Sequence, residues 1–391
     1  MLEAARARGL RVIAADRDPG APGFAFADRR AIISVEDEPQ LDRLAAAARV
    51  DGLIAPGIDW PVAVAARIAE RLVLPHPIDA ATAVLATSKL KQRERFAGAG
   101  VPHPRHVVCA TLGEAAAAAS GFGYPCVVKA PDRQGQKGLV LVRDELLLAD
   151  AFELALGESR SSVVLVEELV PGREVTVNAF SIDGVFFPLT VTDRVVANPP
   201  AFGVALAHVW PSSLLPDETA SAVDAARAAA EAVGVRNGPT YTQVVVGGRG
   251  AFVVELAARL GGGHDAELCE AALGVDLNGL ALAAALGEAA EPSRPVGAAG
   301  GACVRFLVAD PGTLREVDGV DEAAAVDGVF WVRVYREPGA ILGPLRRGSD
   351  RVGAVLAVGG SRDEAVERAE RAADCVRFVT ADAPEAVVPA Q

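Results

Sequence analysis

Short apolar runs alternate with amphipathic segments at the start of the chain. They predict strands at 11–15, 31–35 and 52–56, with helices at 37–49 and 60–71. This alternation predicts an α/β domain over residues 1–87, with parallel strands. Such a domain usually starts with a central strand and a glycine turn, but this chain opens on a helix. Either the first strand is missing from the sequence, or the start site is misplaced, or the fold begins in this way.

The next segment carries one charged helix followed by short strands and helices. Ser88 has the side chain of an N-cap for a helix over 88–99, and Gly100 with Pro102 ends that helix. The elements expected next are strands at 105–109, 126–130 and 138–143 and helices at 112–120 and 145–156. They predict a compact α+β lobe.

From residue 163 the pattern becomes that of antiparallel strands. Asp183-Gly184 predicts a hairpin turn, and Gly247-Gly248 predicts another. The elements expected up to residue 287 are strands at 163–167, 174–182, 184–194, 204–210, 239–247 and 250–257 and helices at 217–233, 265–273 and 276–287.

The end of the chain predicts a linker and one more domain. Residues 288–299 have the Pro, Gly and Ala content of a linker, and the tail from 380 is expected to fray. The elements expected between them are strands near 301–308, 329–335 and 352–358 and an amphipathic helix at 362–374.

The composition is that of a globular protein with several cores. The chain has 391 residues, 51% of them hydrophobic, and a chain of that length is expected to hold about two to four domains. A net charge of −13 argues against a general nucleic-acid or membrane-surface binder, because no broad cationic field is available. No apolar run approaches the ~20 residues that a membrane span needs.

Cysteine and histidine usage favours a cytoplasmic protein without a zinc site. The five cysteines are widely scattered and form no CxxC pair, so neither a disulfide framework nor a zinc site is expected. The five histidines have no metal-ligand spacing. The first residues include an early Glu and no apolar signal-peptide core.

Lysines are confined to one part of the chain. Four lysines stand against 34 arginines, and they are Lys89, Lys91, Lys129 and Lys137. A position that stays lysine in such a chain is a candidate for a task that needs a compact, flexible ammonium group. Lys129 ends an apolar strand, and the loop after it contains Gly135 and Gly138, which allow close backbone approach. The combination predicts phosphate binding, with a plain hairpin turn and solvated lysines as the alternative.

Acidic residues follow the next apolar strand. Glu167 and Glu168 end it, Pro171-Gly172 bends the chain, and Glu174 lies seven residues beyond Glu167. Such a strand–kink–strand can present backbone groups of residues 168–170 to an adenine edge, while Glu174 accepts hydrogen bonds from ribose hydroxyls. The alternative is a hairpin with surface acids.

A third group of polar residues lies on two strands joined by a glycine turn. Gln243 and Glu255 can share one face there, and two oxygen ligands suit Mg²⁺, which takes its remaining ligands from phosphates and water. Arg259 is a candidate anion clamp. The alternative is that Glu255 is a strand-end acid paired with Arg259.

Together these elements resemble the ATP-grasp superfamily of carboxylate–amine ligases. The resemblance covers nearly the whole chain and implies an α/β plus α+β ATP-grasp fold. It divides the chain into an N-terminal Rossmann-like domain at 1–87, a small lobe at 88–170, a large lobe at 171–290 and a biotin-carboxylase-like C-terminal domain at 300–380. The segment from Ser88 through Pro102 is similar to the family's "Asp-Lys … Gly-Val-Pro" helix.

The resemblance also implies roles for individual residues. ATP would be bound by Lys89, Lys129, Gly135, Lys137, Gly138, Glu167, Glu168, Val170 and Glu174. Mg²⁺, or Mn²⁺ in its place, would be bound by Gln243 and Glu255, and Gly261-Gly262-Gly263 belongs to the phosphate segment. Lys129 and Arg259 would take part in catalysis.

This chain departs from the family pattern at three positions. Ser88 stands in place of an Asp, Gln243 in place of the first metal acid, and Ala257 in place of an Asn. Gln offers one neutral oxygen instead of a carboxylate, so we expect weaker binding of at least one metal ion.

The resemblance implies phosphoryl transfer from ATP to a carboxylate, followed by attack of an amine on the acylphosphate. Closure of the loop at 132–138 would exclude water. Arg194, His208 and Arg259 are the candidate substrate residues, although His208 is equally an ordinary strand histidine; Arg305 and Arg333 carry less weight. The substrates would be small molecules, and a homodimer is compatible with the family. A carboxylase that uses carboxyphosphate and an ATP-binding protein without turnover are the alternatives.

Overall fold

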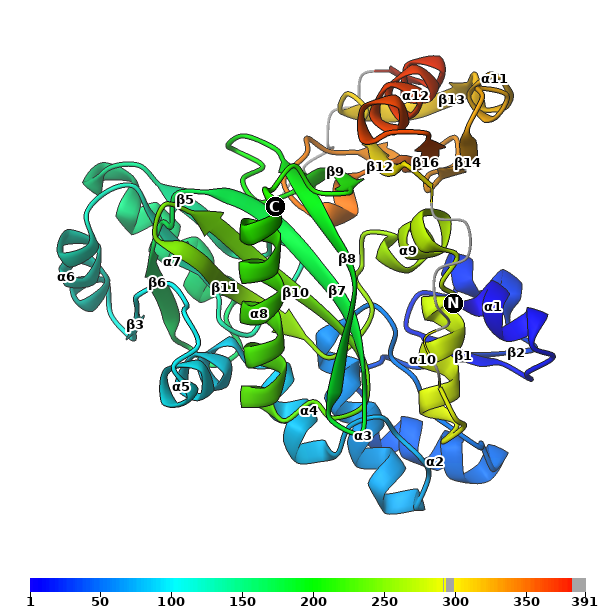
Figure 1. Cartoon of the computed structure of the whole chain (residues 1–391), viewed down its shortest axis with the longest axis horizontal. Helices are drawn as coiled ribbons and strands as arrows, with labels where there is room; N and C mark the ends of the chain where they lie inside the picture. Colours follow the sequence, from blue (N-terminus) through cyan, green and yellow to red (C-terminus); the bar gives the residue numbers. More distant parts are fainter. Residues whose placement is uncertain (291, 293–298, 382–391) are drawn as a thin grey trace, which may run out of the picture. The chain divides into compact units, whose positions relative to one another are not determined.

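The computed structural model describes residues 1–290, 292 and 299–381 (Figure 1). Parts of the expected linker and tail, residues 291, 293–298 and 382–391, lie outside the described residues. The described chain divides into two compact units. The first holds residues 1–104, 170–191 and 214–290, and the second holds residues 105–169, 192–213 and 299–381. The helix over 88–99 therefore belongs to the first unit.

The first unit begins with a two-stranded parallel sheet. Its strands are β1 (Ile13–Asp16) and β2 (Arg29–Ile32), with Ile13 opposite Arg29. The helices and the 3₁₀ turn near them are α1 (Leu2–Ala7), η1 (Pro22–Phe26), α2 (Glu38–Ala48), α3 (Asp59–Leu72) and α4 (Ala80–Ala86).

The third strand expected in this region, at 52–56, is wrong. A Cβ built on Gly52 would lie 2.5 Å from the carbonyl oxygen of Ala285, so the backbone of this segment runs against α10 (Leu277–Ala285). Leu53 packs with Ala45 of α2 and with Val64 and Ile68 of α3, and Ala55 packs against the main core of the unit. Helices rather than neighbouring strands therefore cover Leu53.

The first unit's larger sheet has the strand order β11-β10-β7-β8. These strands are β7 (Arg173–Ile182), β8 (Val185–Val196), β10 (Gly238–Gly247) and β11 (Gly250–Ala257). Asp183 and Gly184 both have left-handed φ values, 50° and 88°, which confirms the hairpin turn between β7 and β8. The turn between β10 and β11 is Gly248-Arg249, one residue later than expected, because Gly247 still pairs with Gly250.

Alternation along these strands separates an apolar face from a polar one. The apolar face packs against α8 (Pro216–Val233), which crosses the strands in Figure 1. The contact surface of α8 is made largely of alanines at helical spacing, Ala222, Ala226, Ala229 and Ala230, which lets the helix lie close to the sheet. The opposite face carries the polar residues Asn178, Tyr241, Gln243 and Glu255. The remaining helices of the unit are α5 (Lys89–Ala99) and α9 (Asp265–Leu273).

The second unit contains a four-stranded antiparallel sheet of order β3-β6-β4-β5. Its strands are β3 (His106–Cys109), β4 (Cys126–Lys129), β5 (Leu139–Val142) and β6 (Val164–Glu168). The helical elements α6 (Leu112–Phe122), η2 (Glu145–Leu147) and α7 (Leu148–Glu158) accompany it. A shared core that includes Ala115, Val128, Phe152 and Val166 joins the helices to the sheet, which confirms the expected α+β lobe.

The rest of the second unit continues from the last residues of β8 through β9 (Ala205–Trp210), β12 (Gly301–Leu307), β16 (Gly353–Gly359) and β14 (Val329–Val334), in that order. The helix α12 (Arg362–Cys375) covers β12 and β16. The sequence missed a small sheet, β15-β13-β17, and two short helical elements. These are β13 (Gly312–Asp318), β15 (Ile341–Leu342), β17 (Arg377–Ala381), α11 (Val320–Ala324) and η3 (Gly348–Asp350).

The start of the expected frayed tail is ordered. Thr380 and Ala381 pair with Leu314 and Thr313, as part of β17 against β13.

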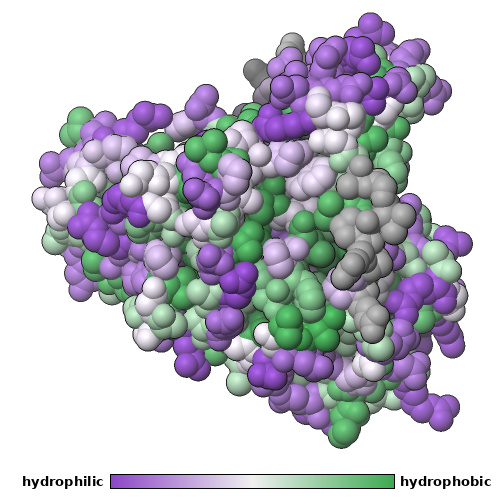
Figure 2. Space-filling model, viewed as in Figure 1, coloured by the Kyte–Doolittle hydropathy of each residue, from purple (hydrophilic) through white to green (hydrophobic). Residues whose placement is uncertain are grey.

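Figure 2 shows hydrophilic side chains over much of the visible face, with smaller apolar areas among them. None of the helices in the described part of the chain is both long and apolar enough to span a membrane.

The close approach of α8 to the sheet makes a prediction about packing. Ala226 is fully buried, so Ala226→Leu would force extra methylene groups into a closed interface. We expect a loss of about 1–3 kcal/mol in the free energy of unfolding, measured by urea denaturation. Ala220→Leu, on the exposed side of the same helix, is the matched control and should leave stability within about 0.5 kcal/mol. Equal effects of the two substitutions would contradict the packing argument.

Candidate functional site

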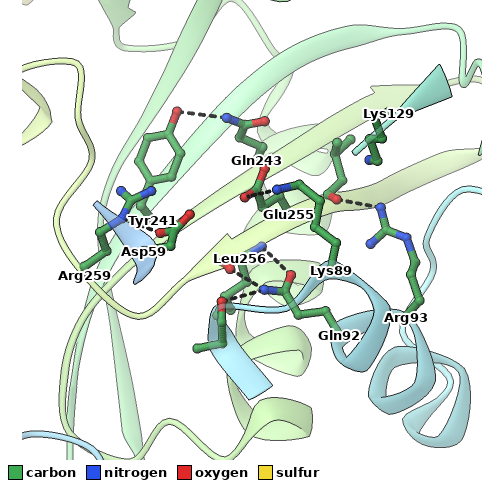
Figure 3. A network of polar contacts seen from close by, with 12 residues as sticks. Asp59, Lys89, Gln92, Arg93, Lys129, Tyr241, Gln243, Glu255, Leu256 and Arg259 are labelled. Carbon is green, nitrogen blue, oxygen red and sulfur yellow. Dashed lines mark hydrogen bonds and ion pairs between the residues drawn. The ribbon is translucent and has the colours of Figure 1, made fainter. Parts of the chain in front are cut away.

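Helix α5 is fixed to the outer edge of β11 by the side chain of Gln92 (Figure 3). Its Nε2 donates to the carbonyls of Leu256 and Ala86, both at 2.7 Å, and its Oε1 accepts the N–H of Leu256 at 3.0 Å. The amide of Gln92 therefore occupies the place of a neighbouring strand and satisfies backbone groups that would otherwise be orphaned. Gln92 is only 1% exposed, so these bonds are shielded from water.

A β-bulge in β11 gives α5 a second attachment point. Gln243 pairs with Glu255 and Val244 pairs with Val253, so Val254 is the extra residue. Its carbonyl accepts a 2.7 Å hydrogen bond from Nη2 of the buried Arg93. Both attachments come from one turn of α5.

Lys89 lies one helical turn before these anchors and therefore points along β11. Its Nζ is 2.9 Å from Oε1 of Glu255, and only 8% of the residue is exposed. Ser88 caps the helix that carries it, since its hydroxyl accepts from the N–H of Lys91. The predicted N-cap is confirmed, and the phosphate lysine and the metal acid of the prediction lie in direct contact.

Gln243 and Glu255 are directly opposite each other on β10 and β11. This confirms that the two side chains share one face. Nε2 of Gln243 donates to Tyr241 Oη at 3.3 Å, an arrangement that leaves the amide oxygen for another partner. One carboxylate and one amide oxygen fit a Mg²⁺ ion that takes its other ligands from phosphates and water. No group of three or more acidic, His or Cys side chains suited to a metal occurs among the described residues.

Arg259 pairs with an acid that the sequence analysis did not identify. Its Nε lies 2.5 Å from Oδ1 of Asp59, in the first turn of α3, and its Nη1 donates to Leu260 O at 2.7 Å. Burial alone would lower the pKa of this guanidinium, but the attraction of Asp59 outweighs it and raises the pKa. Glu255 contacts Lys89, and its charge also helps to raise the pKa of Arg259, so the alternative that Glu255 pairs with Arg259 stays open. Acidic residues are common in the first turn of a helix, where they interact favourably with the helix dipole. The position of Asp59 in the sequence therefore gave no sign of its pairing with Arg259.

The glycine segment after Arg259 is required by close approach. A Cβ on Gly261 would lie 2.2 Å from Oδ2 of Asp265 and 2.5 Å from the ring of Tyr241. Asp265 is fully buried and accepts hydrogen bonds from Gly263 N and Asn178 Nδ2, both at 3.2 Å. These bonds hold the backbone beside Tyr241.

In the second unit, Lys129 forms a buried ion pair with Glu167. The Nζ–Oε2 distance is 2.6 Å, and the residues are 5% and 2% exposed. They lie diagonally on neighbouring strands, since Val127 is opposite Glu167 and Lys129 is opposite Leu165. The alternative of a solvated surface lysine is therefore wrong for Lys129.

Glu168 and its neighbours occupy defined places at the end of β6. Its carboxylate accepts from Arg105 N and Nε, at 3.2 and 2.9 Å, and its N–H donates to Arg105 O at 3.0 Å. The N–H of Glu168 therefore already has a partner, so the expected adenine contact would be made by other backbone groups of residues 168–170.

Val170 and Glu174 belong to the first unit. Val170 is 9% exposed, and Glu174, opposite Val245 on β10, is half-buried.

The loop between β4 and β5 has the backbone expected of a glycine loop. Gly135, Gln136 and Gly138 have left-handed φ values of 68°, 64° and 66°. A Cβ on Gly138 would lie 3.0 Å from Cβ of Glu158 and 3.1 Å from Cβ of Ala130, so a side chain here would force its neighbours to shift. Lys137 is exposed at the tip.

Arg194 and His208 are cross-strand neighbours on β8 and β9. Nη2 of Arg194 donates to Gly203 O at 2.6 Å, which holds the segment between the strands. His208 is 2% exposed and meets the Phe306 ring edge-on, with centroids 5.8 Å apart. That burial agrees with a strand histidine and places its ring inside the sheet's packing. Of the other two candidates, Arg305 is opposite Ala207 and Arg333 lies over the Trp331 ring.

Comparison with known families identifies this arrangement. The model for the carbamoyl-phosphate synthase L chain, ATP binding domain, matches residues 88–292, over half of the chain. The chain belongs to the ATP-grasp family. A second model, L-amino acid ligase C-terminal domain 2, matches residues 305–381. The predicted superfamily and fold class are confirmed, as is the prediction of a ligase that forms C–N bonds. Enzymes of the ATP-grasp family use ATP and Mg²⁺.

Individual ATP-grasp proteins match over most of the chain. The uncharacterized protein y4rH of Sinorhizobium fredii is 30% identical, covering 96% of this chain and 79% of its own. A formate-dependent phosphoribosylglycinamide formyltransferase of Burkholderia pseudomallei is 30% identical, covering 95% of this chain and 91% of its own. The crystal structure of an L-amino acid ligase from Bacillus licheniformis aligns with a TM-score of 0.82 at 22% identity, covering 97% and 95% of the two chains.

The buried pair in this ATP-grasp protein makes a prediction about stability. Lys129→Met leaves Glu167 without its buried ammonium partner, so we expect a loss of about 3–5 kcal/mol in the free energy of unfolding. The double variant Lys129→Met/Glu167→Gln removes both charges and should recover most of that loss. Urea denaturation of wild type, of Lys129→Met, of Glu167→Gln and of the double variant gives the coupling energy between the two residues. Additive effects of the two substitutions would show that the pair is not coupled.

Proposed function

We propose that this protein uses ATP to convert a small carboxylate into an acylphosphate, which an amine then attacks to form a C–N bond. The contact between Lys89 and Glu255, on the polar face that also carries Gln243, is the observation that carries the proposal. It brings a phosphate-binding ammonium group to a carboxylate that can hold a cation.

The ion pairs supply the charge balance that the reaction needs. Lys89, Lys129 and Arg259 contact Glu255, Glu167 and Asp59 respectively. A buried cation is stable only beside an anion. An ammonium group has three N–H donors, so Lys89 and Lys129 would each donate to a phosphate oxygen while they keep the carboxylate that already pairs with them.

The contacts and the family resemblance together support a role for each candidate residue. Lys89, Lys129 and the loop with Gly135, Lys137 and Gly138 bind phosphates, Glu167, Glu168 and Val170 border the adenine, and Glu174 binds the ribose. Gln243 and Glu255 hold the metal, which neutralises phosphate charge when bound. Arg259 orients the carboxylate and stabilises the charge that develops on it, while Arg194 and His208 border the acceptor.

We further propose that the substrates are amino acids. One relative is named an L-amino acid ligase and another a formate-dependent formyltransferase, so the panel of acids includes formate. Arg259 suits any carboxylate, because a guanidinium binds both oxygens of the group. The carbamoyl-phosphate synthase family match keeps a carboxyphosphate reaction as the alternative, and bicarbonate tests it.

A screen of ADP release tests the proposal. Purified protein with Mg²⁺–ATP is given the twenty common amino acids in pairs, then formate or bicarbonate with the same amines. We expect ADP only with a suitable acid and amine, and a new amide in the products by mass spectrometry. The blank is Lys129→Met/Glu167→Gln, which should bind ATP weakly while remaining folded. Release with bicarbonate alone would favour the carboxylase; tight ATP binding without any ADP would favour a protein without turnover.

The residue Gln243 makes a prediction about the metal. Gln243→Glu adds a second carboxylate opposite Glu255, and affinity for a hard cation rises with ligand charge. We expect the Mg²⁺ concentration that half-saturates ATP binding to fall about tenfold, equivalent to about 1.4 kcal/mol. Titration calorimetry at fixed ATP measures it, and Ala220→Glu, on the exposed side of α8, controls for added charge. Equal shifts in both variants would remove Gln243 from the metal site.

A further inference from the structure

Three segments of the second unit meet at the tip of the glycine loop. A Cβ built on Gly203 would lie 2.9 Å from Leu139 Cδ2 and 3.5 Å from Gln136 Cγ. A Cβ built on Gly348 would lie 3.5 Å from Gln136 Oε1. The side chain of Gln136 therefore lies beside both glycines, one in the segment 197–204 and one in the C-terminal turn 343–351.

The segment 197–204 is a preformed loop with its own hydrogen bonds. Ala197 N donates to Val204 O at 2.8 Å, and Val204 N donates to Ala201 O at 3.0 Å. Arg194 adds the 2.6 Å bond to Gly203 O. This loop connects the strands that carry Arg194 and His208, and Arg194 itself bonds to it.

The C-terminal turn is joined to the same loop. Leu345 packs with Ala197, Ala201 and Val204 in a small apolar cluster. Arg351 donates through Nε to Gly348 O at 2.7 Å and lies over the Phe306 ring, 3.7 Å from its centroid. The loop 197–204 thus packs through Leu345 against the turn that also borders Gln136.

The base of the glycine loop is fixed independently. The carboxylate of Asp132 accepts from Arg160 N and Ser161 N, at 3.0 and 2.8 Å, and Arg133 Nε donates to Glu158 O at 2.5 Å. Ala130 N donates to Gly138 O at 3.0 Å, which closes the other end. The base of the loop is thus fixed by bonds that do not involve Gln136, whose side chain lies at the tip between Gly135 and Lys137.

We propose that Gln136 is a positioning residue that couples the glycine loop to the acceptor segment 197–204 and the turn 343–351. This rests on the proposed function, in which the loop covers the ATP phosphates. An acceptor bound near Arg194 holds the segment in place, and the segment then favours the loop position that covers the phosphates and excludes water from the acylphosphate. Phosphoryl transfer is thereby linked to the presence of the second substrate.

Hydrogen–deuterium exchange measured on peptides from 132–139 and 197–204 tests the coupling. Gln136→Ala should raise the exchange rates of both segments several-fold in the absence of nucleotide. Gln134→Ala is the matched control, because it removes the same side chain from the same loop two residues away, and should behave as wild type. Gln136→Glu keeps the length and one oxygen of the side chain and should restore slow exchange.

Mg²⁺–ATP provides a second readout that simple loosening would not change. In wild type, nucleotide should slow exchange in both segments; in Gln136→Ala it should still slow the glycine loop but no longer 197–204. Identical behaviour of the two alanine variants, or an effect confined to 132–139, overturns the coupling. If nucleotide protects neither segment in wild type, the proposed ATP site fails, while the comparison without nucleotide still decides whether Gln136 joins the segments.

Discussion

The side-chain amide of Gln92 is the contact on which the site in the first unit depends. It bonds to both backbone groups of Leu256, so β11 gains a partner along its open edge and α5 gains a fixed rotation. Arg93 repeats the arrangement at the bulge. Because Lys89 is one turn away, its ammonium group can reach Glu255 only while this register holds. The side chain of Gln92 thus positions Lys89 beside Glu255.

Paired charges occur in both units. Lys89 and Arg259 in the first unit and Lys129 in the second each contact a carboxylate, and all three are largely buried. Burial without partners would cost several kcal/mol per ion, so the acids stabilise these cations in the folded protein. Gln243 is neutral, so Glu255 is the one carboxylate of this opposed pair. The positive charge of Lys89 therefore balances the single negative charge of Glu255, whereas a pair of carboxylates would carry two.

Sequence patterns worked best where structure is local. The capped helix after Ser88, the Asp183-Gly184 turn and the strands on either side of Gly248 depend on residues within a few positions, and the sequence predicted them to within one or two residues. The strand expected at 52–56 is wrong because Leu53 packs against the helices α2 and α3 rather than between strands. The sheet containing β13 and β17 was missed because its strands come from distant segments and pair through backbone groups.

The sequence by itself determined the order and type of most elements, the glycine loop, and the chemical groups available to bind phosphate, metal and carboxylate. It did so because spacing, capping and turn residues act between neighbours along the chain. Only the tertiary structure decided the partners: Asp59 for Arg259, Glu167 for Lys129, Gln92 for the edge of β11 and Gln136 beside Gly203. Those choices bring together residues as much as 200 positions apart, and burial and electrostatic complementarity select them after the elements have packed.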